Sequence, residues 1–140
     1  MVHWSIWVAI AVVVIVVYYY NKFVSLSNRI KNSLGQISVQ LKKRADLVPN
    51  LLESVKGYMK HEKSVLVEVT KARTSFMNAK GTEKKVAAGG QLQSALKSLF
   101  AVAESYPDLK SSQNFLEFQR ELASIEDKVA YARQYYNDSI

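Results

Sequence analysis

The sequence predicts an all-α protein in which one N-terminal transmembrane helix precedes an antiparallel four-helix bundle. Two observations indicate this class. Residues 4–20 form an uninterrupted apolar run, and the rest of the chain repeats its apolar residues at steps of three and four, as on one face of a helix. No stretch has the period of two that is typical of a strand. We therefore predict a membrane anchor over residues 1–24 and a bundle over residues 25–140.

The anchor is predicted from the run WSIWVAIAVVVIVVYYY, which contains no charged residue. With a rise of about 1.5 Å per residue, the run extended to Val24 reaches about 32 Å, enough to cross a hydrocarbon core of about 30 Å. Lipid offers no hydrogen-bond partner to the backbone, so the segment must be helical. Aromatic rings that favour the two membrane interfaces stand at its ends: Trp4, Trp7, Tyr18, Tyr19 and Tyr20.

Two other interpretations of this run are weaker. A cleaved signal peptide needs a positive N-terminal region and small residues at the cleavage site, whereas the chain opens with MVHW and continues with the bulky VVYYYNK. A lipoprotein signal needs a cysteine, and the chain has none. A buried core helix normally has a polar face, which this run lacks. An uncleaved anchor is the preferred interpretation.

The distribution of charge predicts the orientation. The N-terminal flank carries no Lys or Arg, while Lys22, Arg29 and Lys31 follow the apolar run, and such cations stay preferentially in the cytoplasm. We expect an N-terminus outside and residues 21–140 inside. Residues 22–85 carry 14 Lys and Arg against 5 Asp and Glu, a net charge of +9, and the remainder carries −2. The basic first half suggests an anionic surface, most simply lipid headgroups.

The first two bundle helices are predicted on either side of Pro49. The first ends near residues 46–49, because the residue before proline is pushed out of helical geometry; its stripe is Phe23, Leu26, Ile30, Leu34, Ile37 and Leu41. The second runs from Asn50 to Asn78 with the stripe Leu52, Val55, Met59, Glu62, Leu66, Val69, Ala72 and Phe76. The alternative is one long helix that kinks at Pro49.

The third and fourth helices follow the cluster Asn78–Gly81. The third carries Leu92, Leu96, Leu99 and Ala103, starts either at Thr82 or after the Gly89–Gly90 pair, and ends at residues 106–108. The fourth has the clearest spacing of the chain, and its cap is Asn114, Asp108 or Ser111. Its stripe is Phe115, Phe118, Leu122, Ile125, Val129, Ala132 and Tyr136.

These helix lengths predict which cations meet the lipid. A first helix that continues from the anchor places residues 42–44 roughly 32 Å above the bilayer, beyond the screening length of about 8 Å, as a solvated tip. The second helix, about 29 residues long, then returns the chain to the membrane. We predict a basic collar that contacts anionic lipid, made of Lys22, Lys80, Lys84 and Lys85. The alternative is that these lysines lie in a solvated loop.

The residues give no support for an enzyme. The chain has no cysteine, and its histidines are His3 and His61. It contains no HExxH, GxxxxGK[ST], GxGxxG or GxSxG motif, and no Glu-x-x-His pair for a di-metal centre. We therefore assign no catalytic, cofactor-binding or metal-binding residue. Glu62 is interpreted as a carboxylate paired with a nearby Lys or Arg, and the Lys42–Arg44 cluster as a solvated tip or a local turn contact, with no nucleic acid as partner.

Several ordered segments resemble the LemA family. They are Gln40–Leu52 (QLKKRADLVPNLL), Val55–Tyr58 with His61–Glu62, Thr70–Arg73 (TKAR), Tyr106–Lys110 (YPDLK), Phe118–Leu122 (FQREL) and Ala132–Asn137 (ARQYYN). The resemblance implies a single-pass protein of the bacterial inner membrane with a bundle-type soluble domain and no established enzymatic activity. One branch is associated with formation of the magnetosome membrane. Family members usually continue past the last helix by several turns and a tail, whereas this sequence stops at Ile140.

Two functions are consistent with these observations. The first is a non-enzymatic scaffold that organises the membrane through homo-oligomers, with the lipid bilayer as its main partner. The second is a membrane-tethered signalling or stress-response adaptor, whose bundle recruits a soluble protein partner. Neither function needs a cofactor.

Overall fold

The computed structural model describes residues 2–139, which are helical with short connections and contain no strand. The all-α class is therefore confirmed. Within this range the helices are α1 (Val2–Lys56), α2 (Lys63–Asn78), α3 (Thr82–Ala103), α4 (Pro107–Lys110) and α5 (Gln113–Asn137).

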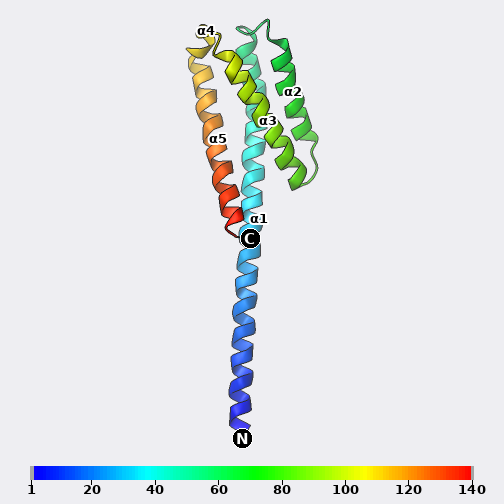
Figure 1. Ribbon diagram of the computed structural model, residues 1–140, viewed down its shortest axis with the longest axis vertical. Helices are drawn as coiled ribbons and strands as arrows, with labels where there is room; N and C mark the ends of the chain where they lie inside the picture. Colours follow the sequence, from blue (N-terminus) through cyan, green and yellow to red (C-terminus); the bar gives the residue numbers. More distant parts are fainter. Residues whose placement is uncertain (1, 140) are drawn as a thin grey trace.

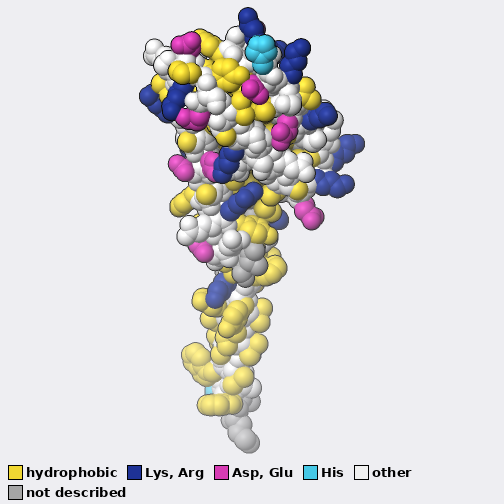
Figure 2. Space-filling model, turned by 45° about the horizontal axis from the view of Figure 1, so that its top comes forward, with side chains coloured by type: hydrophobic (Ala, Val, Ile, Leu, Met, Phe, Trp, Pro, Cys, Tyr) yellow, Lys and Arg dark blue, Asp and Glu magenta, His cyan; other side chains and the backbone are white. Residues whose placement is uncertain are grey.

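Helix α1 is the spine of the molecule. It is 55 residues long, and its first part projects alone from the other helices (Figure 1). Every side chain of residues 3–25, here called the stem, is exposed. Burial begins at Leu26 and Ser27, and we call residues 26–139 the head. The stem is apolar and long enough to cross a membrane. Figure 2 shows its hydrophobic surface below a head that carries most of the charged side chains.

The predicted break at Pro49 is wrong, because α1 continues to Lys56. Proline removes the amide that would bond the carbonyl four residues earlier, that of Ala45. Here Arg73 of α2 replaces the lost donor: its Nε lies 2.9 Å from the Ala45 oxygen. Pro49 itself is exposed, while Val48 and Leu51 on either side are fully buried. Tertiary contacts therefore hold the helix through the proline.

The chain reverses at residues 57–62 and not at Asn50, so the second helix is much shorter than predicted. Helix α2 has 16 residues. The turn is closed by backbone hydrogen bonds from Met59 to Val55 and from Glu62 to Met59, at 2.9 and 3.1 Å. Met59 is fully buried beneath this turn. The apolar stripe predicted for one helix is thus divided between the end of α1 and α2.

Helix α3 starts at Thr82, the earlier of the two predicted positions. The glycine pair lies inside it, and Gly89 permits a close approach to α1: a Cβ there would lie 2.8 Å from Leu41 Cδ2. Gly90 has open space instead. The helix is preceded by Gly81, whose φ of +85° favours glycine.

Helix α5 follows the short α4, and it begins after Ser112, so none of the three predicted cap residues holds that position. Its predicted stripe is confirmed by five buried residues: Phe115, Leu122, Ile125, Val129 and Ala132. Phe118 and Tyr136 are partly buried. Near the α4 end, the rings of Phe115 and Phe100 pack edge to face with centroids 5.6 Å apart.

The head has its core where α1 meets the other helices. Helix α5 lies along α1, α3 packs on both α1 and α2, and the chain reverses direction from α1 to α2, from α2 to α3 and from α3 to α5 (Figure 1). The largest fully buried side chains come from every helix: Leu41, Val48, Leu51, Val55, Val69, Leu92, Leu99, Leu109, Phe115 and Ile125, together with Met59 of the turn.

Candidate functional site

The stem is the first candidate functional region, because its apolar side chains are exposed. The predicted interface rings lie at its two ends, and all are exposed: Trp4, Trp7, Tyr18, Tyr19 and Tyr20. Exposed aromatic rings at both ends of an apolar span fit the headgroup layers of a bilayer. Their contact with lipid stays a prediction.

The predicted basic collar is not assembled in the structure. Lys80 lies between α2 and α3, and Lys84 and Lys85 lie in the first turn of α3. This turn is beside Leu34, which shares a hollow with Thr82. Lys22 precedes Leu34 by 12 residues on α1, a rise of about 18 Å. The collar was predicted from a return helix of about 29 residues, whereas α2 has 16; the contact of these lysines with lipid stays a prediction.

The Lys42–Arg44 cluster divides between solvent and core. Lys42 and Lys43 are exposed, and they pair with Asp46 and Glu121, each at 3.4 Å. Arg44 is only 2% exposed, so its prediction as part of a solvated tip or of a local turn is wrong. The helical step of one residue turns its side chain from the solvent face of α1 toward α3 and α5.

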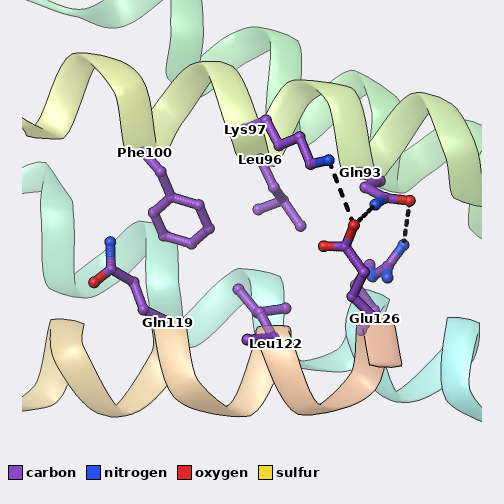
Figure 3. Close-up of a pocket in the computed structure, with 9 residues that line it drawn as sticks. Gln93, Leu96, Lys97, Phe100, Gln119, Leu122 and Glu126 are labelled. Carbon is purple, nitrogen blue, oxygen red and sulfur yellow. Dashed lines mark hydrogen bonds and ion pairs between the residues drawn. The ribbon is translucent and has the colours of Figure 1, made fainter. Parts of the chain in front are cut away.

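Arg44 lines a cleft of about 270 Å³, and the other lining residues belong to α3 and α5, as the labelled side chains of Figure 3 show. Its Nη1 donates to Gln93 Oε1 at 3.4 Å, and Gln93 Nε2 donates in turn to Glu126 Oε1. Lys97 Nζ pairs with the same Glu126 oxygen at 3.4 Å. The other part of the cleft is apolar, where Leu96 and Leu122 face each other near Phe100. The cleft thus combines a polar end with an apolar wall.

Burial lowers the pKa of the Arg44 guanidinium from its ordinary value. Glu126 opposes this shift, and Arg133 adds to it. Arginine nevertheless stays protonated at neutral pH, so the cleft has a permanent positive charge in its lining. Sequence reasoning missed this site, because its residues lie on three helices and its buried cation resembles its exposed neighbours along the chain.

Glu62 has a different partner from the predicted Lys or Arg. Its Oε1 accepts a hydrogen bond of 3.0 Å from the Tyr106 hydroxyl, and this bond raises the pKa of Tyr106. His61 and His3 are exposed. Within residues 2–139, no three His, Cys, Asp or Glu side chains form a group that could hold a metal ion.

The segments that carry the family resemblance meet one another in the fold. Arg73 of the TKAR segment bonds the Ala45 carbonyl of the QLKKRADLVPNLL segment, and Tyr106 of the YPDLK segment bonds Glu62. These contacts join segments that lie 28 and 44 residues apart. These two polar contacts therefore link parts of the head that lie far apart in the sequence.

Comparison with known proteins places these features in one family. A model of the LemA family matches residues 33–140. The chain is 28% identical over 118 residues to "Protein LemA" of Metamycoplasma hominis, covering 84% of this chain and 54% of that protein. It is 24% identical over 144 residues to "Magnetosome protein MamQ 2" and equally to "Magnetosome protein MamQ 1" of Paramagnetospirillum magneticum, covering 84% of this chain and 53% of each. The chain spans about half the length of these relatives.

Proposed function

Because the chain belongs to the LemA family and its exposed apolar stem runs without a break into its head, we propose that it is a non-enzymatic, single-pass membrane scaffold. The observation that carries the proposal is the continuity of α1. From Asn21 to Lys56 the helix rises about 53 Å, and its last part is packed into the core. A head built around the same helix that crosses the bilayer is held at a set distance from the lipid.

In this proposal the stem spans the bacterial inner membrane with its N-terminus outside. The head is an antiparallel four-helix bundle in the cytoplasm, made of the second half of α1 with α2, α3 and α5. Three exposed cations after the span support this orientation, namely Lys22, Arg29 and Lys31. A phosphatase fused after residue 140 should be inactive in a bacterial host, and strong periplasmic activity would overturn the orientation.

We further propose that the scaffold organises membranes through homo-oligomers formed by its head. Support comes from the side where α1 and α5 meet. Val39 and Tyr131 are 62% and 71% exposed there, and both border shallow hollows that include Gln36 and Gln40. A second head would cover the Val39 and Tyr131 side chains, and two relatives are named as magnetosome proteins.

Electron microscopy of the full-length protein in liposomes tests this function. We expect clusters, rings or tubulated vesicles, and Tyr131→Asp should weaken assembly because it places a charge in the proposed interface. Ser98→Asp is the matched control, since Ser98 is exposed on α3. Inert monomers on unchanged vesicles would contradict scaffolding.

A second candidate function is a membrane-tethered adaptor that recruits a soluble partner. The cleft between α3 and α5 favours it, because an open site with a buried cation in its lining is suited to a ligand. Monomers that leave vesicles unchanged but bind a soluble peptide would identify the adaptor.

A further inference from the structure

The charges around the α3–α5 cleft are unbalanced. Arg44 and Lys97 line it, and Glu126 is the single carboxylate among its lining residues. Arg133 is close enough to affect Arg44 as well. Lys97 already pairs with Glu126, so this carboxylate is shared. The positive charge of the cleft is therefore sufficient to attract one more carboxylate.

Arg44 also has few hydrogen bonds to protein for a buried cation. Its guanidinium has five N–H donors, and within residues 2–139 it donates one hydrogen bond, which is long and goes to the neutral amide of Gln93. Burying a charge is costly unless the charge is paired and hydrogen-bonded. A side chain that is 98% buried and borders an open cleft is placed to receive an anion.

We propose that this cleft binds a partner peptide through an acidic side chain next to a bulky apolar one. The carboxylate accepts hydrogen bonds from Arg44 and Lys97. The apolar side chain packs on Leu96, Phe100 and Leu122. The proposal names the partner chemistry of the adaptor function and rests on that function, while its test measures peptide binding alone.

Two observations select a peptide over other anions. The cleft, at about 270 Å³, is just below the roughly 300–1,000 Å³ of small-molecule pockets, and it suits two adjacent side chains. Lipid headgroups are too distant, because Arg44 follows Lys22 by 22 residues, or about 33 Å along α1. That distance exceeds the screening length of about 8 Å at physiological salt.

The test uses the full-length protein in nanodiscs of neutral phosphatidylcholine, with nuclear magnetic resonance of the side-chain amides of Gln93 and Gln119 as the readout. The probes are the blocked peptide Ala-Leu-Glu-Phe-Ala and its Gln counterpart, Ala-Leu-Gln-Phe-Ala. We expect saturable shifts with the first and binding about tenfold weaker with the second, the loss of one charge-assisted contact. Equal binding of the two peptides would overturn the proposal.

Variants locate the site. Lys97→Gln should weaken binding several-fold, and Lys128→Gln is the matched control because Lys128 is exposed on α5 outside the cleft. Arg44→Gln should abolish binding. If that variant fails to fold, Ala123→Trp blocks the cleft from an exposed position on its wall and should have the same effect. Equal effects of the two lysine changes would overturn the site.

A small-molecule arm separates the sources of the carboxylate. Free 3-phenylpropionate contains the same charge and an apolar ring, and it should bind more weakly than the peptide. Tighter binding of the free acid would overturn the choice of a peptide. Vesicle remodelling is measured in a separate experiment. The peptide-binding results can therefore be interpreted even if the scaffold proposal fails.

Discussion

The stem and the second half of α1 belong to one continuous helix and have opposite surroundings. All side chains of residues 3–25 are exposed, whereas residues 33–56 place a stripe in the core: Ser33, Ile37, Leu41, Arg44, Ala45, Val48, Leu51, Leu52 and Val55. Residues 4–20 of the stem form an apolar surface on every side, whereas the second half of α1 is mainly apolar on one side only. A protein core needs one apolar face, while lipid needs all of them. The helix therefore changes its solvent, not its geometry, along its length.

Removing volume should have its largest effect in the head. Leu41→Ala and Ile125→Ala delete side chains that are 1% exposed, and each should lower the free energy of unfolding by about 2–5 kcal/mol. Val12→Ala in the stem removes volume from a side chain that no other helix covers, and head stability should not change. Hydrogen exchange of α3 and α5 amides in mild detergent measures the stability of the head in the core variants and in the stem variant. Similar losses at stem and core positions would erase the distinction between the two regions.

A charge should reverse this order. Val13 and Val67 are both exposed, at 60% and 49%, but we place one in lipid and the other in water. Val13→Lys should raise the free energy of membrane insertion by about 2.5–3.5 kcal/mol, the cost of a cation at the centre of a span. Val67→Lys should leave both insertion and head stability nearly unchanged, within about 0.5 kcal/mol. A glycosylation-based insertion assay compares them, and equal insertion would show that the stem does not span the bilayer.

The glycine pair tests how closely the head packs on α1. Gly89→Ala should destabilise the head by about 1–3 kcal/mol, because the added methyl would lie 2.8 Å from Leu41. Gly90→Ala has open space and should stabilise α3 by up to about 1 kcal/mol through helix propensity. Urea denaturation of the two variants gives the comparison. Stabilisation by both changes would mean that α3 and α1 are farther apart than the structure shows.

The smallest expected effect concerns the bond that holds α1 through Pro49. Arg73→Met removes the donor to the Ala45 carbonyl and should cost about 1–2 kcal/mol. In the Pro49→Ala background the backbone amide supplies that donor again, so the same change should cost less. A double-mutant cycle measures the coupling. Additive effects would indicate that Arg73 stabilises α1 by packing alone.

The spacing of apolar residues along the chain was sufficient to predict much of the fold. The apolar stem, the all-helical class and the stripe of α5 from Phe115 to Ala132 follow from residue spacing, because each depends on neighbours within one helix. The start of α3 at Thr82 was one of two positions that the spacing allowed. The predicted lysine collar depended on a second helix of about 29 residues, and the 16 residues of α2 contradict that length.

By itself, the sequence determined that the chain is helical, that its N-terminal segment is the one that is apolar all round, and that cations are in excess after that segment. Only the tertiary structure decided that α1 passes Pro49, that Arg44 is buried while Lys43 is exposed, and that Gly89 meets Leu41. Each of these features depends on a group from another helix, as when Arg73 bonds the carbonyl that Pro49 leaves without a donor. The spacing of apolar residues describes each helix on its own. A group that another helix supplies cannot be predicted from that spacing, because it comes into place only when the helices pack.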